Sequence, residues 1–383
     1  MNSKKKKDEA RMKFQIEKAD LQRGLGRIQS IVEKRNSMPI LANVLLEAEK
    51  KAGTIMLAAT DLEVGIRSVH QATVTEAGSV TVSAKKLYEI IRELPEESIE
   101  IEVSENFYLS IRCARARFSL AGTAAEEYPS LPDFAPGKLA TLHAAVLSSM
   151  IDRTMYAASV DETRYNLNGV LFEMLEETGK IRMIATDGHR LAMVERNIGN
   201  ELEGLGSGVI IPRKGLGELK RLVDEDDADE VSLGFEGNSG LVRKGNVTLV
   251  MRLIEGEFPN YRQVIPSDTT HQLTTGREAL VHALRRVSLL SAERSHAVKM
   301  DLSQGCLALS SNNPDLGEAR EELDVDYAGD ALSVAFNARY LIDALGAAGS
   351  KEIQLAFRDS LSPAQVKPTD DDDTLAVVMP MRV

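Results

Sequence analysis

The sequence predicts an α+β protein made of three repeated domains, each with two helices packed on antiparallel sheets. Two observations predict this class. Amphipathic helical segments alternate with short segments rich in branched residues, and the whole pattern recurs about every 125 residues. A chain of 383 residues also has room for roughly two to four domains of ordinary size.

A short motif at the end of a strand fixes the register of the repeat. It reads Ala59-Thr60-Asp61 in the first copy, Ala185-Thr186-Asp187 in the second and Ser310-Ser311-Asn312 in the third. Equivalent residues lie 126 positions apart (186 − 60) and then 125 positions apart (311 − 186). Unrelated segments rarely keep such a spacing, so the copies are expected to share one fold.

Each copy is expected to open with a helix that carries Arg on its polar face. The three segments space apolar residues by three and four, as one helical face requires: 21–32, 146–157 and 280–291. A strand segment follows each of them, at 43–48, 169–174 and 297–302.

The rest of each copy is expected to hold a second helix and further strands. A strand and helix are predicted at 82–94, 211–223 and 336–347. Strand patterns then cover 98–103 with 108–120, 231–253, and 353–357 with 375–381.

Periodicity lapses at two joints rich in Pro and Gly, 128–137 and 255–266. We therefore expect domains at 12–133, 134–262 and 263–383, after a Lys-rich extension at 1–11. The Lys4–Lys7 run suits a solvated tail or an expression scar better than a nucleic-acid patch.

Composition restricts the environment and the partners. No apolar run is long enough to cross a bilayer and the opening residues do not resemble a secretion signal, so a soluble cytoplasmic protein is expected. Cys113 and Cys306 are far apart, which suggests neither a disulfide framework nor a zinc site. The net charge of −12 requires any DNA contact to use a segregated basic surface.

The repeat also suggests an assembly. Domains that expose sheet edges can pair edge to edge, and closing the circle removes the unpaired edges. Arg-bearing helix faces turned inward would then attract duplex DNA without reading its sequence. The plain alternative is that these helix faces are merely solvated.

Several longer motifs resemble the bacterial DNA polymerase III beta subunits, the sliding clamps. The resemblance covers the chain from Met12 onward and rests on these segments, in family order and spacing: MPILAN at 38–43, ATDLE at 59–63, RFSL at 117–120, YPSLP at 128–132, RYNLNG at 164–169, ATDGHRLA at 185–192, IPRKG at 211–215, 255–266 and VVMPMR at 377–382. It implies a homodimeric head-to-tail ring of three-domain subunits, with helices lining the hole, which serves as the processivity factor of a replicative polymerase.

The resemblance implies a pocket for short partner peptides between the second and third domains. Its matching positions are Leu167, Thr186, Gly188, His189, Arg190, Leu191, Pro259, Val264, Asn337, Tyr340, Val377, Met379, Pro380, Met381 and Arg382. Leu, Val, Met and Pro suit apolar anchors, and the polar members suit a peptide backbone. Without the resemblance, 379–381 would simply be an edge strand and His189 a loop residue.

The resemblance also implies contacts with DNA and with a second subunit. The DNA positions are Arg35, Lys85, Arg164 and Tyr165, which can meet phosphate without reading bases. Asp161 departs from the family, which often has an amide there, and this puts a contact at Asp161 or Asn166 in doubt. The dimer positions are Lys86, Arg115, Arg117, Phe118 and Leu120 on the first domain, facing Leu289, Leu290, Glu318 and Glu321 on the third.

Other functions find less support. Asp187, His189 and Arg190 have acid–base residue types, but no Ser or Cys lies in a nucleophile-elbow context. The run Asp370–Asp373 lacks the ligand spacing of a calcium loop and suits an exposed loop, and no phosphate-binding loop is present. We expect no cofactor, no metal and no catalysis. Expected partners are duplex DNA, a second subunit, the polymerase catalytic subunit, the clamp loader and other clamp-motif proteins; the alternative is an oligomeric peptide-binding scaffold that does not encircle DNA.

Overall fold

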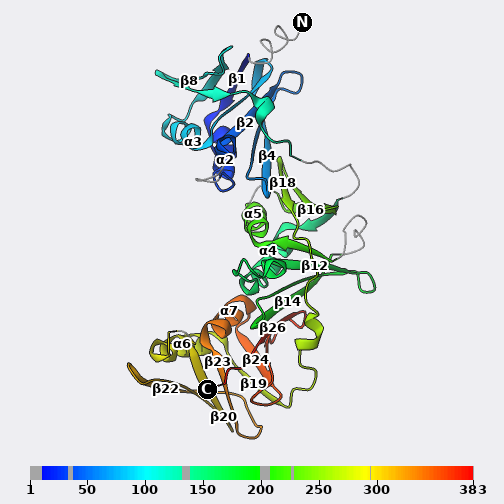
Figure 1. The fold of residues 1–383 in the computed structure, drawn as a ribbon, viewed down its shortest axis with the longest axis vertical. Helices are drawn as coiled ribbons and strands as arrows, with labels where there is room; N and C mark the ends of the chain where they lie inside the picture. The colour runs from blue at the N-terminus through cyan, green and yellow to red at the C-terminus, as the bar shows by residue number, and fades with distance from the viewer. Residues whose placement is uncertain are drawn as a thin grey trace. The chain divides into compact units, whose positions relative to one another are not determined.

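The computed structural model describes residues 11–32, 38–131, 139–198, 208–225, 228–293 and 295–382 (Figure 1). Its contacts form two compact units. Unit 1 comprises the described residues within 1–144 and 217–253, and unit 2 those within 145–202, 206–216 and 254–383. The unit boundary therefore passes through the middle of the chain's second repeat.

The three repeats share one order of elements. The first contains β1 (Met12–Glu17), α2 (Lys18–Ile28), β2 (Asn43–Glu49), β3 (Thr54–Thr60), β4 (Val64–Gln71), β5 (Thr73–Glu76), β6 (Gly78–Ser83), α3 (Ala84–Glu93), β7 (Ser98–Val103), β8 (Leu109–Cys113), β9 (Ala116–Leu120) and β10 (Gly122–Thr123). The second contains β11 (Ala140–His143), α4 (Ala144–Asp152), β12 (Gly169–Leu175), β13 (Lys180–Thr186), β14 (Arg190–Asn197), β15 (Val209–Pro212), α5 (Arg213–Val223), β16 (Glu230–Glu236), β17 (Ser239–Lys244) and β18 (Val247–Arg252).

The third repeat contains β19 (His271–Gly276), α6 (Arg277–Val287), β20 (Ala297–Ser303), β21 (Cys306–Asn313), β22 (Gly317–Asp324), β23 (Leu332–Asn337), α7 (Ala338–Ala348), β24 (Glu352–Phe357), β25 (Ala364–Pro368) and β26 (Thr374–Val378). Short 3₁₀ helices lie at Pro39–Ala42, Ala125–Glu127, Met155–Ala157, Tyr165–Leu167, Tyr261–Val264 and Ser288–Leu290. The structure thus confirms the α+β class, with two helices and antiparallel strands in each repeat.

Each repeat divides its strands into two halves. The front half comprises strands between the two helices, β2, β3, β4 and β6 in the first repeat. The back half combines the opening strand with three strands after the second helix, β1 with β7, β8 and β9 in the first repeat. The first repeat also adds β5 to its back half and β10 to its front half. Front and back halves of successive repeats join at antiparallel edges, β4 with β18 in unit 1 and β14 with β26 in unit 2. The joined sheets have nine and eight strands, in the orders β10-β6-β2-β3-β4-β18-β17-β16-β11 and β15-β12-β13-β14-β26-β25-β24-β19.

Two half-sheets remain without a partner half in the described chain. One is β5-β1-β7-β8-β9 in unit 1, whose edge strand is β9, and the other is β22-β21-β20-β23 in unit 2, whose edge strand is β22. By the repeat, β9 corresponds to β18 and β26, and β22 corresponds to β4 and β14. The two free edges are therefore of the types that join elsewhere in the chain.

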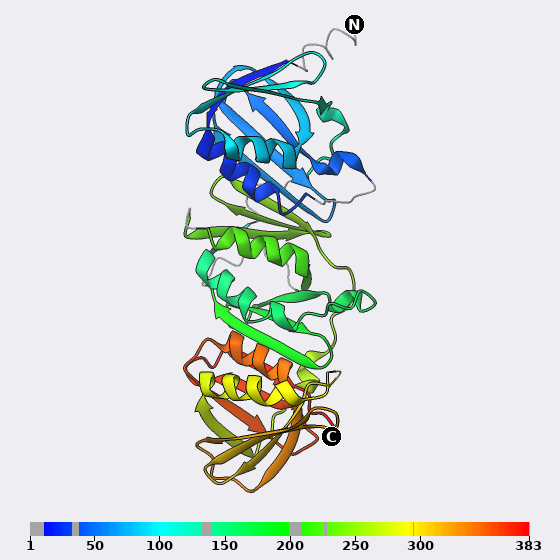
Figure 2. The ribbon, with the colours of Figure 1, turned by 90° about the vertical axis from the view of Figure 1, so that its left-hand side faces the viewer.

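Helix pairs cover the sheets and supply the cores. In unit 1, α2 lies beside α3, and in unit 2, α6 lies beside α7 (Figure 2). The apolar spacing of α2 buries Leu21, Leu25 and Ile28 completely or almost so. In the third repeat, Leu280, Leu284 and other α6 residues meet Phe336 and Phe357 in one buried cluster. Burying such side chains contributes roughly 1.5–3 kcal/mol each.

The ends of three helices are satisfied by cations from other elements. Lys18, the first residue of α2, donates from Nζ to the carbonyl of Leu94 beyond α3 at 2.5 Å. Arg277, its counterpart on α6, donates to the Ser350 carbonyl beyond α7 at 2.6 Å. In the second repeat the counterpart is Ala144, and Lys244 of β17 supplies the cation instead, 3.0 Å from the Leu222 carbonyl of α5. Each cation lies beside carbonyl groups at or just beyond the C-terminal end of a helix, where the helix dipole favours positive charge.

The first helix of each repeat starts and ends earlier than the periodicity predicts. The observed bounds are Lys18–Ile28, Ala144–Asp152 and Arg277–Val287, because each helix begins directly where a strand ends. The strands before these helices, β1, β11 and β19, were not predicted. Several Arg residues on or beside these helices also form ion pairs instead of being only solvated. Arg27 pairs with Glu225, Arg153 with Asp371 and Arg286 with Glu321.

Candidate functional site

A tight turn between β13 and β14 shapes the candidate site in unit 2. The Thr186 hydroxyl donates to the Arg190 carbonyl at 2.6 Å and accepts from the Gly188 amide at 3.1 Å. The Asp187 carboxylate accepts from the amides of His189 and Arg190 at 2.9 and 3.1 Å. Gly188 has a φ of 87°, a conformation that favours glycine. The hydrogen bonds of Thr186 and Asp187 therefore stabilise the turn, and glycine at position 188 allows the positive φ that the turn requires.

This turn borders an apolar cavity of about 140 Å³. The cavity is lined by Leu167, Thr186, Gly188, Arg190, Leu191, Pro259, Asn260, Tyr261, Val264, Val377 and Met379. Leu191 and Val377 are buried and form its floor, whereas Val264 and Met379 are 40% and 37% exposed. A buried apolar floor beneath exposed apolar rims suits a side chain presented by another molecule. Its predicted role as a peptide pocket remains a prediction.

Arg190 is held rigidly at one wall. Its guanidinium donates to Asp187 at 3.1 Å, to Asp343 at 2.5 Å and to the Tyr156 carbonyl at 2.8 Å. It also lies over the rings of Tyr340 and Tyr156, 4.7 and 5.4 Å from their centroids. Burial raises the pKa of both tyrosines, so both rings stay neutral. Arg190 thus connects β14 to α7 and presents its stem, rather than a free charge, to the cavity.

The other predicted pocket residues lie away from the cavity lining. His189 stacks on Tyr340 with ring centroids 6.0 Å apart, beside Arg190. Asn337 caps α7 by accepting from the Arg339 amide at 2.9 Å. The Met381 amide donates to the Ala335 carbonyl at 2.7 Å, which attaches the C-terminal segment to β23. Pro380 is partly buried and Arg382 exposed.

Sequence reasoning missed four residues of this site. Asn260 and Tyr261 line the cavity, and Tyr156 and Asp343 hold Arg190. The segment 255–266 was recognised as a joint, so Asn260 and Tyr261 could have been included. Asp343 and Tyr156 gave no signal, since one charged and one aromatic residue on helical segments have many ordinary roles.

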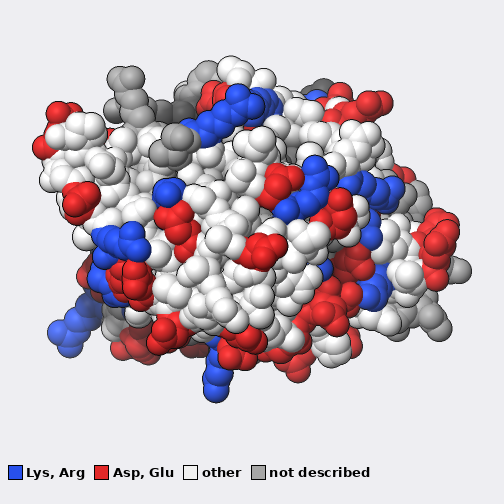
Figure 3. Space-filling view, turned by 90° about the horizontal axis from the view of Figure 1, so that it is seen from below, with Lys and Arg blue, Asp and Glu red and all other residues white. Residues whose placement is uncertain are grey.

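The predicted DNA-binding residues that the structure describes belong to both units, Lys85 to unit 1 and Arg164 and Tyr165 to unit 2. Lys85 is exposed and lies 3.8 Å from Glu89. Arg164 donates to the Asp187 carbonyl at 2.8 Å and lies 3.8 Å from Asp161, while Tyr165 is 57% exposed. Arg35 lies outside the described residues. Figure 3 shows basic side chains intermixed with acidic ones on the face that it presents.

The two residues in doubt for DNA make contacts within unit 2. Asp161 accepts from the Thr163 hydroxyl and amide at 2.7 and 3.0 Å, and these hydrogen bonds lower the pKa of Asp161. The carboxylate therefore stays charged at neutral pH. Asn166 donates to the Glu257 carbonyl at 2.9 Å.

The predicted dimer residues lie mostly along or beside the two free sheet edges. Arg117 and Phe118 are exposed on β9, and Leu120 ends that strand partly buried. Arg115 is exposed in the turn before β9, and Lys86 lies on α3, 2.8 Å from Glu89. Glu318 and Glu321 lie on β22, where Glu321 pairs with Arg286 at 2.5 Å. Leu289 is 76% exposed and Leu290 partly buried after α6.

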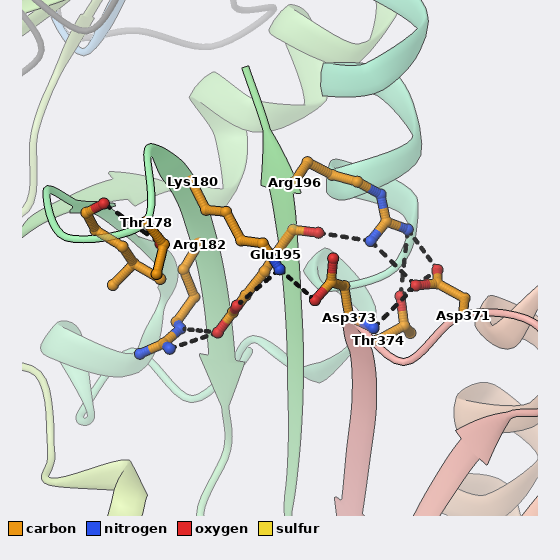
Figure 4. Close-up of polar contacts among 9 residues, drawn as sticks. Thr178, Lys180, Arg182, Glu195, Arg196, Asp371, Asp373 and Thr374 are labelled. Atoms are coloured by element: carbon orange, nitrogen blue, oxygen red, sulfur yellow. Dashed lines mark hydrogen bonds and ion pairs between the residues drawn. The ribbon is translucent and has the colours of Figure 1, made fainter. Parts of the chain in front are cut away.

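The acidic run does not form a fully exposed loop. Asp371 is partly buried and accepts from Arg196 at 2.5 Å (Figure 4). It also accepts from Arg153 at 2.7 Å. Asp373 pairs with Lys180 at 2.6 Å. These contacts fasten the turn before β26 to β13, β14 and the end of α4 within unit 2. The expectation of an exposed loop was therefore wrong for Asp371, whereas the Asp373 side chain stays 40% exposed.

Among the described residues, no His, Cys, Asp and Glu group has the arrangement of a metal site. Within the same residues, no helix is both long enough and apolar enough to span a bilayer.

Comparison with known proteins places every repeat in one family. Residues 12–132, 141–260 and 262–382 match the N-terminal, central and C-terminal domains of the DNA polymerase III beta subunit. The Beta sliding clamp of Caulobacter vibrioides is 37% identical over 379 residues, covering 97% of this chain and all of the relative. The Beta sliding clamp of Escherichia coli is 35% identical over 374 residues, with the same coverage.

Solved structures agree with the sequence relatives. The DNA polymerase sliding clamp of Bacillus subtilis superposes with a TM-score of 0.92 at 28% identity, covering 97% of this chain and 99% of that structure. A sliding clamp from Pseudomonas aeruginosa bound to griselimycin superposes with a TM-score of 0.90 at 36% identity, covering 97% of this chain and all of that structure. With all three domains matched in order along the whole described chain, the chain belongs to the DNA polymerase III beta subunit family, the bacterial beta sliding clamps.

Proposed function

We propose that the protein is the non-catalytic sliding clamp of a bacterial replicative polymerase, a head-to-tail homodimeric ring around duplex DNA. Its three domains are proposed to span 12–133, 134–262 and 263–383. Partner peptides from the polymerase, the clamp loader and repair proteins would dock in the cavity beside Arg190. Family membership and the pair of unfilled sheet edges support this proposal.

The observation that carries the ring is the pattern of half-sheets. Front edges β4 and β14 each pair with a back edge, β18 and β26, and in the described chain this leaves front edge β22 and back edge β9. The same antiparallel joint can form between β22 of one copy and β9 of another. Two such joints close a homodimer head to tail and remove both free edges.

The repeat also specifies the register of that joint. In the existing joints, Gly65 faces Val250 and Leu191 faces Val377. The strand pairings within each repeat make Ala319 of β22 the equivalent of Gly65 and Leu191. They make Ser119 of β9 the equivalent of Val250 and Val377. Antiparallel pairing of Ser119 with Ala319 then sets Arg117 opposite Glu321.

Charge and exposure support this register. Arg117 and Phe118 are exposed on β9, while β22 presents Glu318 and Glu322 to solvent. An Arg–Glu pair across neighbouring strands contributes roughly 0.2–1 kcal/mol, and the backbone hydrogen bonds and the apolar Phe118 and Leu289 add to it. Glu321 would exchange or share its present partner Arg286 on assembly.

The cavity suits short extended peptides for physical reasons. Its floor accepts an apolar side chain, and its rim residue Met379 can adapt to different anchors. Lys85, Arg164 and Tyr165 would meet the DNA backbone, with Arg23 and Arg285 as further exposed cations on α2 and α6.

The decisive experiment loads the protein onto nicked circular DNA with a bacterial clamp loader and ATP. Retention is then measured at high salt before and after the circle is cut, because high salt removes proteins held only by charge. A ring stays on the circle and is lost after cutting. Loss from both forms, with the loader shown to load its own clamp, would favour the peptide-binding scaffold; retention on both would indicate direct DNA binding.

A further inference from the structure

The Thr-Asp turn that borders the site in unit 2 has a counterpart in unit 1, between β3 and β4. The Thr60 hydroxyl donates to the Val64 carbonyl at 3.0 Å and accepts from the Leu62 amide at 3.0 Å. The Asp61 carboxylate accepts from the amides of Glu63 and Val64 at 2.9 and 2.8 Å. These bonds match those of the Thr186–Arg190 turn one by one.

The neighbouring strand is matched as well. The Arg252 amide donates to the Glu63 carbonyl at 2.7 Å, as the Met379 amide donates to the His189 carbonyl at 2.9 Å. Arg252 and Met379 therefore occupy equivalent positions at the ends of β18 and β26. A proline from the segment that follows the last strand of a repeat also lines each cavity, Pro129 in unit 1 and Pro259 in unit 2.

This counterpart borders a larger cavity, of about 330 Å³, formed entirely by residues of unit 1. It is lined by Thr60, Leu62, Glu63, Val64, Gly65, Pro129, Ser130, Leu131, Asn238, Ser239, Val250, Met251 and Arg252. From this geometry we propose that unit 1 carries a second docking pocket, for a short extended segment of a partner protein that places an acidic side chain beside an aliphatic one.

The aliphatic part of the proposal rests on the floor and the mouth of the cavity. Val64, Val250 and Met251 line it and are buried. At the mouth, Leu62 is 53% exposed and has a φ of 79°, which strains a branched side chain and leaves its apolar surface in water. An aliphatic side chain from a partner would cover Leu62 and reach this floor.

The preference for an acidic side chain in the ligand rests on Arg252, which stands in unit 1 where unit 2 has Met379. The Arg252 guanidinium is exposed, and within the described residues no side-chain partner meets it. Val64 also replaces Arg190, so this pocket lacks the clamped cation of its counterpart. Glu63 lies at the same mouth and has interactions of its own. The cation available to a ligand is therefore Arg252, which favours a carboxylate.

The side chains that fill the two sites also differ. A Cβ at Gly65 would lie only 2.2 Å from Cδ2 of Leu131, so Leu131 fills the place that the Leu191 side chain takes in unit 2. The Leu131 carbonyl in turn accepts from Arg67 at 2.8 Å. In the unit 1 pocket, Leu131 therefore takes the part that Leu191 plays in the unit 2 cavity. The two sites have different linings, so we expect them to prefer different ligands.

The test uses the full-length protein with Leu and Val methyl groups labelled for NMR. The probe is the peptide acetyl-Glu-Glu-Leu-Leu-amide, and the control peptide is acetyl-Lys-Lys-Leu-Leu-amide. Leu62, Val64 and Val250 report on the pocket in unit 1, whereas Leu167, Val264 and Val377 report on the cavity in unit 2. The acidic peptide is expected to shift the unit 1 methyls saturably and the basic peptide to bind at least about tenfold more weakly.

Variants distinguish this pocket from the proposed clamp site. Arg252→Glu should weaken the acidic peptide about tenfold or more and strengthen the basic one, while Arg92→Glu, an exposed Arg on α3, should change neither. Met379→Glu should change the peptide-induced shifts of the unit 2 methyl groups only. If the unit 2 cavity proves not to bind peptides, the unit 1 methyl groups still test the present proposal. Unit 1 methyls that do not saturate, or an acidic-peptide affinity unchanged by Arg252→Glu in a folded protein, would overturn the proposal.

Discussion

At the scale of single residues, buried or clamped cations hold the elements that shape both cavities. Arg190 is fixed by two carboxylates and two aromatic rings, and Lys244 lies almost fully buried at the end of α5. The residue types at the cavity in unit 2 could be named from sequence, because the family motifs contain them. The residues that hold Arg190 could not, since Tyr156 and Asp343 meet it only in the folded protein.

Replacing Asp343 by Asn should loosen Arg190 while keeping the size of the side chain. Since Asp343 is nearly half exposed, the ion pair should contribute about 1 kcal/mol or less. Affinity for a short peptide with apolar anchors should therefore fall by up to about fivefold, measured by fluorescence anisotropy. Asp268→Asn, at another exposed ion pair of unit 2, is the control. Equal affinities for the Asp343 variant and wild type would show that Arg190 needs no such support.

Lys244→Met should destabilise unit 1. Methionine preserves the apolar stem, but it cannot donate to the carbonyls of Leu222 and Val223, which lie 3.0 and 3.4 Å from Nζ. The expected loss in free energy of unfolding is about 1–3 kcal/mol, from denaturant titration with hydrogen exchange to localise it. Lys351→Met, at an exposed position, should have little effect. A Lys244→Met variant as stable as wild type would mean that water replaces the lysine.

At the scale of elements, periodicity located the second helices closely and the first helices with a shift. It missed several strands, among them β4, β14 and β22; of these, β22 carries Glu and Arg instead of alternating apolar residues and leaves most of them exposed. It also could not show that Asp371 packs against Arg153 and Arg196, which are more than 170 residues away in sequence (371 − 196 = 175). Long-range ion pairs leave no local pattern.

The Asp371 cluster should give unit 2 a pH-dependent stability. Burial opposes ionisation, but the hydrogen bond from Thr374 and the charges of Arg196 and Arg153 outweigh it and lower the pKa of Asp371 below 3.8. A lowered folded-state pKa stabilises the fold above the unfolded value and loses that effect as pH falls through the folded value. Asp371→Asn should therefore unfold at lower denaturant than wild type at pH 7.

The comparison should be made by denaturant titration at several pH values. The gap between wild type and Asp371→Asn should shrink progressively below about pH 3.8. Asp372→Asn, at the exposed neighbour, should follow wild type throughout. A gap that stays constant at acid pH would assign the effect to packing rather than to charge.

At the scale of the whole molecule, comparing the repeats shows which sheet edges join within the chain and which stay free, and no single domain shows this. The sequence repeat indicated three similar domains, yet the described contacts form two units, because joined sheets cross from one repeat to the next. Strand pairing between repeats depends on edges, and edge pairing cannot be recognised from the period of the sequence alone. The free edges follow only once the sheet orders are known.

Reversing one charge across the proposed subunit joint should weaken the dimer. Arg117→Glu would face Glu321 and should raise the monomer fraction seen by light scattering at low micromolar protein, whereas Arg117→Glu with Glu321→Arg should restore the dimer. Arg92→Glu serves as a charge-matched control away from β9. If the double variant stays monomeric while folded, the register derived from the repeat is wrong.

The polar character of β22 also bears on aggregation. A free, flat and apolar edge would accept strands from any unfolded or partly folded chain. Here Glu318, Arg320, Glu322 and Asp324 present charge along the edge that no partner half covers in the described chain. Only a strand with matching charges can approach it without burying unpaired ions. In the proposed dimer, these charges would therefore oppose unspecific strand addition at β22, while the charge-matched β9 of a second copy could still pair there.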